Sequence, residues 1–197
     1  MGTCGLSGAP FKVTCVRYGY TVVGKGTTCF LWRQLEREAD VYRMLSPVQG
    51  SAVPVFLGKI NMQKIYRLHG AGKIWHMLLM GWGGDTIDTV KTDIRTENRS
   101  IARAKKEIES LGVLHQDLAS RNVLWNEELD RAMIIDFHLC EFDLHRVKKK
   151  PKWLVEKDSG LALAEAEDND ETLRHCPYHG TCIHRLVRSC PNEMYGI

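Results

Sequence analysis

Two short segments of the sequence carry carboxylate and amide side chains at a spacing that could do chemistry. The first contains Asp117 and Asn122, and the second ends an apolar run with Asp136, fourteen residues after Asn122. A carboxylate can orient a hydroxyl group and accept its proton, and carboxylate and amide oxygens are hard ligands for a divalent cation. An ordinary polar loop between a helix and two strands is the alternative interpretation. The spacing, and the place of Asp136 at the end of an apolar run, favour a chemical role.

Around these residues the sequence resembles the catalytic loop and metal-binding Asp of the protein-kinase-like phosphotransferases. Their patterns are H-R-D-x-x-x-x-N and D-F-G, and this chain has H-Q-D at 115–117, followed by Asn122, and D-F-H at 136–138. The resemblance implies that Asp117 orients the acceptor hydroxyl, and that Asn122 and Asp136 hold the Mg²⁺ ions that bridge the phosphates of ATP.

Two positions depart from the family pattern. Gln116 replaces the usual Arg, so we expect no activation loop that is switched by phosphate pairing with that Arg. His138 replaces the usual Gly, which removes the freedom to take a positive φ at that point. Residues other than Gly are familiar there in the small-molecule kinase branch, so His138 counts only weakly against activity.

The N-terminal half carries a second set of matching residues. Glu38 lies on the apolar stripe of a predicted helix, seven residues after Leu31 and seven before Leu45. A buried carboxylate is costly unless a cation meets it. Residues 22–25 resemble the V-A-I-K strand of kinases, which implies that Lys25 contacts the α- and β-phosphates and pairs with Glu38. A surface Lys and a half-exposed Glu are the alternative.

Two further segments fit the same resemblance. Residues 2–11 resemble a degenerate G-x-G-x-x-G-x-V phosphate-covering loop, in which Gly5 and Gly8 keep the second and third glycine positions and Thr3 stands at the first. The resemblance also implies a hinge that binds the adenine, formed by Leu79, Met80, Gly81 and Trp82.

The resemblance covers about residues 5–142 and is closest to the fungal kinase-like and aminoglycoside phosphotransferase-like proteins. It implies an α+β, two-lobe protein-kinase-like fold with a small β-rich N-lobe, a shortened helical C-lobe and the nucleotide between them. We expect a kinase-like domain over 1–144, with the N-lobe at about 1–80 and the C-lobe at about 85–144. A charged tail, partly ordered at best, is expected over 145–197.

Hydrophobic patterning predicts the elements that position these residues. A strand, a turn at 17–19 and a second strand ending at Lys25 are expected first. Helical spacing predicts helices over 31–45 and 98–111, the second one ended by Gly112. Further strands are expected at 53–57, 74–80, 123–125 and 132–135. Strands with one helix first, and then mostly helix, make an α+β plan.

Composition excludes several classes of protein. The 197 residues are 44% hydrophobic and 26% charged, which excludes a disordered or fibrous chain, and no apolar run approaches the ~20 residues of a membrane span. A net charge of +3 is too slight to indicate nucleic acid. Composition therefore favours neither a membrane nor nucleic acid as a partner, and the resemblance implies ATP and an unidentified protein or small-molecule acceptor. The seven cysteines are an odd number, and four of them are scattered through apolar or Gly-rich stretches, which favours reduced thiols and an intracellular location, cytoplasmic or nuclear.

The tail carries two weaker signals and lacks one expected motif. His and Cys residues over 175–190 could hold Zn²⁺, but their spacing fits no common pattern of paired cysteines. A basic cluster over 146–152 could be a nuclear-import or nucleic-acid patch, although such runs are more often a solvated face. No A-P-E segment follows Asp136.

Three hypotheses follow. The leading one is an ATP-dependent phosphotransferase that moves the γ-phosphate to a hydroxyl acceptor, with protein Ser/Thr and small molecules both open. The second is a pseudokinase, a nucleotide-binding interaction module without turnover. The third is a zinc or nucleic-acid protein that uses the tail.

Overall fold

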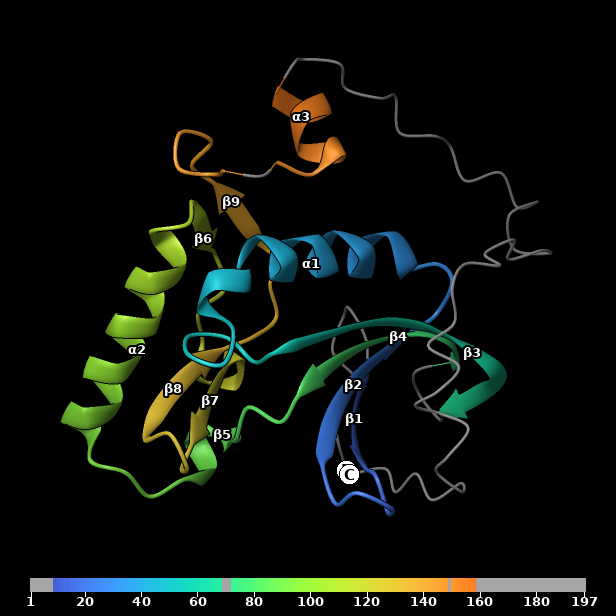
Figure 1. Ribbon diagram of the computed structural model, residues 1–197, viewed down its shortest axis with the longest axis horizontal. Coiled ribbons are helices and arrows are strands. Elements are labelled where there is room, and N and C mark those ends of the chain that lie inside the picture. The colour runs from blue at the N-terminus through green and yellow to red at the C-terminus, as the bar shows by residue number, and fades with distance from the viewer. Residues whose placement is uncertain (1–8, 69–71, 149, 159–197) are drawn as a thin grey trace.

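The computed structural model describes residues 9–68, 72–148 and 150–158. Four strands, β1 to β4, make up one lobe, while the helix α2 and several short strands make up the other (Figure 1). The helix α1 lies across the middle of this view, above the strands of the first lobe, and α3 lies above α1.

The first lobe is built on one antiparallel sheet with the strand order β1-β2-β4-β3. Its strands are β1 (Ala9–Thr14), β2 (Thr21–Thr27), β3 (Phe56–Leu68) and β4 (Gly72–Gly81). The register places Lys25 opposite Leu78, and Val23 opposite Met80. Directly opposite residues share a face of the sheet, so these four side chains lie on one face. Leu79 follows the alternation to the other face.

The helix α1 (Trp32–Met44) is the helix that the apolar stripe predicts over 31–45. It buries Leu35, Ala39 and Tyr42 in the main hydrophobic cluster, together with side chains of β4 and Phe137. Glu38 is buried on the same side of the helix, with 1% of its side chain exposed. The helix ends at Leu45, where the short 3₁₀-helix η1 (Ser46–Val48) begins with a proline in its first turn.

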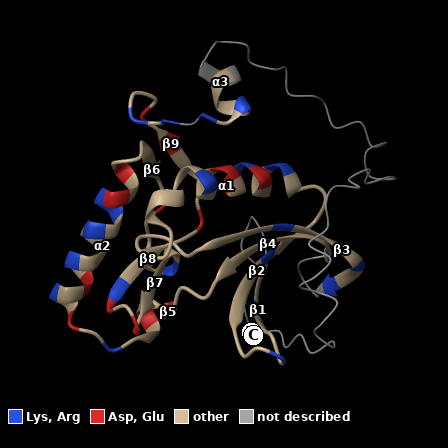
Figure 2. Cartoon of the chain, viewed as in Figure 1, with Lys and Arg blue, Asp and Glu red and all other residues tan. Residues whose placement is uncertain are grey.

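The second lobe combines one long helix with short strands. The strands β5 (Asp85–Thr86), β7 (Val123–Asn126) and β8 (Arg131–Ile134) form one sheet, and β6 (Val113–His115) pairs with β9 (Cys140–Phe142). The helix α2 (Ile94–Glu109) buries Ala104 and Ile108, and carries charged side chains along its length (Figure 2). The remaining elements are η2 (Ile87–Thr89), η3 (Ser120–Asn122) and α3 (Lys152–Asp158).

Two elements differ from the sequence expectations. The helix α2 begins at Ile94 rather than 98, because the Asp93 side chain accepts a hydrogen bond from the Thr96 backbone N–H and caps a polar first turn that an apolar stripe does not reveal. Strand β3 begins at Phe56 and continues to Leu68, well beyond the predicted 53–57. Within the described residues the segment 85–144 has α2 as its one α-helix, which agrees with the shortened C-lobe that the resemblance implies, and α3 lies in the segment expected as the tail.

Gly84 allows the chain to pass closely beside β7. Its φ is +108°, and a Cβ at this position would lie 1.9 Å from the backbone oxygen of Trp125. A side chain could not be accommodated without moving backbone. Gly112, with φ +81°, ends the turn after α2 as the sequence predicts.

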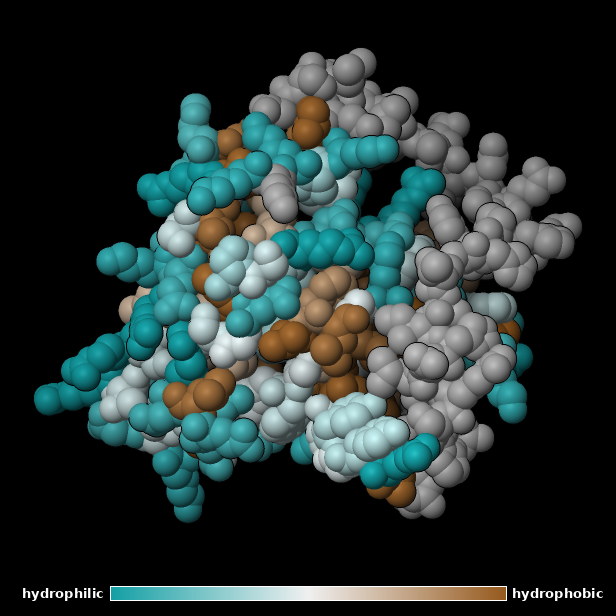
Figure 3. Space-filling model, in the orientation of Figure 1, coloured by the Kyte–Doolittle hydropathy of each residue, from teal (hydrophilic) through white to brown (hydrophobic). Residues whose placement is uncertain are grey.

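The outer surface shows no single large apolar face in the view of Figure 3, where smaller brown areas lie between hydrophilic ones. Exposed large apolar side chains come from several elements, including Tyr18 in the first hairpin, Ile94 in α2 and Val155 in α3. Scattered exposed apolar residues are normal for a protein surface. Among the described helices, none is long and apolar enough to cross a membrane.

Candidate functional site

Three residues from separate elements meet at the centre of the molecule. Lys25 on β2 donates a hydrogen bond from Nζ to Glu38 Oε2 at 2.7 Å and to Asp136 Oδ1 at 2.6 Å. The exposed fraction is 13% for the Lys25 side chain and 26% for that of Asp136. The predicted Lys25–Glu38 pair is therefore present in the structure, and it joins Asp136, which lies 111 residues further along the chain. We call Lys25, Glu38 and Asp136 the lysine–carboxylate triad.

The ionisation of the triad follows from burial and mutual charge. Burial alone would lower the pKa of Lys25, but attraction to Glu38 and Asp136 outweighs it and raises that pKa above 10.5. Burial raises the pKa of Glu38 despite its contact with Lys25. Burial would also raise the pKa of Asp136, but the Lys25 ammonium outweighs that effect and the pKa of Asp136 is lowered. The ammonium and at least the Asp136 carboxylate are therefore charged at neutral pH.

The backbone at Asp136 has the unusual conformation that turns its side chain toward Lys25. Its φ is +66°, in the left-handed region that a non-glycine residue rarely adopts. The next residue, Phe137, is buried between the rings of Tyr42 and His115, at centroid distances of 5.3 and 5.0 Å. His138 turns back so that its Nδ1 lies 2.8 Å from Asp136 Oδ1. The positive φ therefore lies at Asp136 and not at His138, which stands where the family pattern has Gly.

The loop around Asp117 is fixed by hydrogen bonds from two sides. The backbone N–H of Asp117 donates to His115 Nδ1 at 3.2 Å, and His115 Nε2 lies 3.0 Å from the backbone oxygen of Ile135. Because Nδ1 accepts, the proton of a neutral His115 belongs on Nε2, from which it is donated to Ile135. Asn122 Nδ2 donates to the Asp117 backbone oxygen at 2.7 Å and to Oδ2 at 3.2 Å. The Asn122 Oδ1 atom lies outside these bonds.

Arg121 is a site residue that the sequence analysis missed. Its Nη2 lies 2.6 Å from both carboxylate oxygens of Asp117. Hydrogen bonding from Arg121 lowers the pKa of Asp117, so this carboxylate is a weak base that remains ionised at neutral pH. Residue spacing gave no signal for this pair, because the chain from Asp117 to Ala119 is a loop, and only its fold brings the Arg121 guanidinium back onto Asp117.

The donor set fits Mg²⁺ in the company of phosphate oxygens. Mg²⁺ is commonly held by one or two carboxylates plus substrate phosphates rather than by a cage of protein ligands. Asp136 supplies an anionic oxygen and Asn122 an amide oxygen. The described residues contain no group of three or more His, Cys, Asp and Glu side chains that could hold a metal ion without such a co-ligand.

Two of the residues predicted to bind the adenine, Leu79 and Met80, lie on opposite faces of the sheet, because side chains alternate along β4. Met80 lies on the face of the sheet that carries Lys25, whereas Leu79 packs against the second hydrophobic cluster on the opposite face. The Gly81 backbone N–H donates to the Val55 backbone oxygen at 2.8 Å. Trp82 receives the Lys12 ammonium over its ring, at 3.8 Å from the centroid.

Other predicted features fall elsewhere. Gly5 and Gly8 lie outside the described residues, as do the His and Cys residues of the tail over 175–190. Of the basic cluster over 146–152, Arg146 forms an ion pair with Asp143 at 3.0 Å.

The sheet, the helix α1 with its Glu38 on Lys25, and the loops carrying Asp117 and Asp136 together form a protein-kinase-like fold, of the α+β class that the sequence predicts. Among solved structures, a Stt7 homolog from Micromonas algae, soaked with ATP, has this fold: the TM-score is 0.56 at 16% sequence identity, over 70% of this chain and 47% of that one. The chain is also 42% identical over 136 residues to the meiotic driver SPOK2 of Podospora anserina, a fungus. That match covers 69% of this chain and 17% of the relative, so the chain spans about a sixth of that protein's length. No protein-family model matches the chain.

Proposed function

We propose that this chain is an ATP-dependent phosphotransferase that moves the γ-phosphate of ATP to a hydroxyl acceptor. The observation that carries the proposal is the meeting of Lys25, Glu38 and Asp136 beside a loop in which Asn122 is bonded to Asp117. In protein kinases, turnover requires both the Lys–Glu ion pair and the metal-binding Asp to be in place. The kinase-like fold supports the proposal and adds no evidence of turnover.

Each residue has a role in this proposal. Lys25 binds the α- and β-phosphates, and Glu38 holds the ammonium in position. Asp136 and Asn122 hold Mg²⁺, which would neutralise charge on the phosphate oxygens. Asp117 accepts a hydrogen bond from the acceptor hydroxyl and takes its proton as the hydroxyl oxygen bonds to the γ-phosphorus and the bond to the β-phosphate oxygen breaks, releasing ADP. Gly5, Gly8 and the hinge from Leu79 to Trp82 bind the rest of the nucleotide.

The low pKa of Asp117 is compatible with this role. Phosphoryl transfer proceeds through a loose transition state in which positioning and charge stabilisation matter more than proton abstraction. A weakly basic Asp117 therefore acts mainly by orienting the hydroxyl, and Arg121 and Asn122 fix the carboxylate for that purpose.

A second candidate function is a nucleotide-binding module without turnover. The contacts already made by the Asp117 and Asp136 carboxylates favour it. Both oxygens of Asp117 are occupied by Arg121, and one oxygen of Asp136 is shared by Lys25 and His138. An acceptor hydroxyl would have to share Asp117 with a guanidinium.

The proposal also includes a kinase-like domain that ends at about residue 144 and an intracellular location for the protein.

The test compares two nearly isosteric variants with the parent protein. Asp117→Asn should abolish phosphate transfer and leave Mg·ATP affinity within about threefold, because Asp117 is not a main metal ligand. Asp136→Asn should also weaken Mg²⁺-dependent ATP binding, because it removes an anionic oxygen from a hard cation. The measurements are titration calorimetry with and without Mg²⁺, and transfer from labelled ATP to protein and small-molecule hydroxyls.

The outcomes separate the candidates. Equal transfer by the parent and Asp117→Asn would refute the assignment of Asp117. A parent that binds Mg·ATP and transfers phosphate neither to an acceptor nor to water would select the binding module. A well-folded parent that does not bind millimolar Mg·ATP would exclude both.

A further inference from the structure

The outer face of α1 is held by a segment from the other lobe. The turn before α3 is fixed to the second lobe, since the Asp143 backbone N–H donates to the Gly112 backbone oxygen at 2.9 Å, and Val147 is buried. In α3, Leu154 is buried, and the ring of Trp153 meets that of Phe142, on β9, edge to face at 5.5 Å. The start of α3 is therefore anchored on the second lobe.

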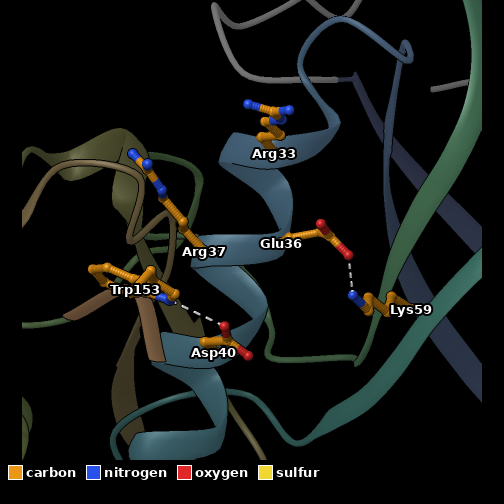
Figure 4. A pocket seen from close by; sticks show the side chains of 6 residues that line it. All are labelled: Arg33, Glu36, Arg37, Asp40, Lys59 and Trp153. Carbon is orange, nitrogen blue, oxygen red and sulfur yellow. Dashed lines mark hydrogen bonds and ion pairs between the residues drawn. The ribbon is translucent and has the colours of Figure 1, made fainter. Parts of the chain in front are cut away.

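Trp153 then contacts α1 directly. Its indole Nε1 donates to Asp40 Oδ2 at 3.1 Å, and the Arg37 guanidinium lies 5.8 Å from the centre of its ring (Figure 4). The other carboxylate oxygen of Asp40 is bonded to Arg43 at 2.5 Å. An indole has one N–H donor, so this bond fixes the rotation of its ring as well as its position.

A pocket lies beside Trp153 on this face of α1. It is lined by charged side chains of α1, among them Arg33 and Glu36, together with Lys59 and Trp153 (Figure 4). Glu36 pairs with Lys59 of β3, and both side chains are about one-third exposed. Such exposed pairs restrain a helix weakly. Trp153 is the one aromatic side chain that lines this pocket.

We propose that Trp153 is a positioning residue that acts through α1 on Glu38. Asp40 follows Glu38 by two residues, which is a rotation of about 200° around the helix, so the two carboxylates leave α1 on opposite sides. A hydrogen-bonded helix turns as a unit. Holding Asp40 from outside therefore limits the rotation that would carry Glu38 away from Lys25. This inference rests on the proposed function for its effect on nucleotide affinity, but not for its effect on α1.

The test uses three variants on one short helix. Trp153→Ala removes the ring and its N–H, Trp153→Phe keeps an aromatic ring without the N–H, and Val155→Ala is the matched control because Val155 is exposed on the same helix. Amide hydrogen exchange over residues 32–44, measured without nucleotide, reports on α1 alone. Titration calorimetry with Mg·ATP reports on the site.

Trp153→Ala should raise exchange in α1 by about tenfold and weaken Mg·ATP binding by about three- to tenfold, because a smaller fraction of molecules holds the binding-competent arrangement. Trp153→Phe should lie between this variant and the parent, and Val155→Ala should match the parent. In a Glu38→Gln background, Trp153→Ala should cause no further loss of affinity, since the pair that it positions is already gone. If Trp153 had a merely structural role, Trp153→Ala would raise hydrogen exchange in all elements, and it would still lower Mg·ATP affinity in the Glu38→Gln background.

The inference and the proposed function fail separately. Unchanged exchange in α1 for both Trp153 variants, with Mg·ATP binding intact, would overturn the inference and leave the function standing. Raised exchange in α1 in a protein that never binds Mg·ATP would retain the positioning of α1 and overturn the function. If Trp153→Ala does not fold, Trp153→Phe decides the question by the same measurements.

Discussion

Removing Lys25 should destabilise the fold more than removing either of its partners. In Lys25→Met, the buried Glu38 and the partly buried Asp136 are left facing each other without a cation. Breaking a buried ion pair by deleting one partner costs about 3–5 kcal/mol, a large part of the ~5–15 kcal/mol that stabilises an ordinary domain. Because Asp136 is 26% exposed and can be hydrated in part, we expect a loss in the free energy of unfolding near about 3 kcal/mol at pH 7.

Glu38→Gln should cost much less. Lys25 keeps its bond to Asp136 at 2.6 Å, so no charge is left alone. The substitution gives up a charge-assisted hydrogen bond, worth about 1.5–3 kcal/mol, and also relieves the burial of a carboxylate whose Oε1 has no hydrogen-bond partner among the described residues. The two effects offset in part, and we expect a net loss of about 1 kcal/mol.

Acid should reduce the loss caused by Lys25→Met. The pKa of Glu38 is already raised by burial, and it rises further when the ammonium is gone. An acid whose folded-state pKa exceeds its unfolded value of about 4.5 binds more protons when folded, so the free energy of unfolding increases as the pH falls through the raised pKa. The difference between parent and variant should therefore shrink between about pH 7 and pH 5.

Urea unfolding followed by tryptophan fluorescence at pH 7 and pH 5 measures these differences, with the buried Trp32 and Trp125 as reporters. Lys59→Met is the matched control: its pair with Glu36 is about one-third exposed, so its loss should stay below about 1 kcal/mol at both pH values. The reasoning is refuted if Lys25→Met costs no more than Lys59→Met, or if its cost does not fall on acidification.

Three further predictions concern other parts of the structure. Gly84→Ala should lower the free energy of unfolding by about 3 kcal/mol or more, since its Cβ would meet backbone, whereas Gly19→Ala, also at positive φ but in open space, should cost only about 1–2 kcal/mol; urea unfolding compares them. His76→Gln should flatten the pH dependence of the melting temperature between about pH 6.5 and pH 5, because burial lowers the pKa of His76, the unfolded chain binds the extra proton, and the parent loses stability as the pH falls through this window. Arg121→Ala should raise the pKa of Asp117, seen by NMR titration of its carboxyl carbon, and an unchanged pKa would refute the clamp.

Each member of the lysine–carboxylate triad could be found in the sequence from its own local signal, and the family resemblance implied the Lys25–Glu38 pair, but the contact of Lys25 with Asp136 was not predicted. Glu38 interrupts an apolar stripe, Lys25 ends a run typical of a strand, and Asp136 follows one. Arg121 had no such signal, because it meets Asp117 across a loop and not along a helix. The role of His138 could not be predicted, because it depends on the positive φ that the structure has at Asp136, and a loop conformation of that kind has no signature in residue types.

The helices and strands were predictable where apolar residues recur at one regular spacing, that of a helix or of a strand, and less so elsewhere. The helix α1 and the strand β4 have clear apolar patterns, and both lie within two residues of their predicted limits. The continuation of β3 beyond the predicted limit has side chains too polar to indicate a strand in the sequence alone. Its backbone pairing with β4 keeps this segment extended. The contact of Trp153 with Asp40 joins residues 113 positions apart, so only the folded chain brings them together.

The charges of the site indicate that nucleotide and metal enter together. Around the triad and the Asp117 loop, the described structure holds three carboxylates, of Glu38, Asp117 and Asp136, and two permanent cations, of Lys25 and Arg121. With Glu38 ionised, and counting these five groups alone, the formal sum is −1, which repels a polyphosphate. A divalent cation on Asp136 changes the sum to +1 and attracts one. ATP without Mg²⁺ should therefore bind more weakly than Mg·ATP, by a margin that falls when Asp136 is replaced by Asn, since that replacement removes both the repulsion and the metal ligand. Equal affinity for the two forms in the parent would mean that the phosphates lie away from this cluster, whatever the fold.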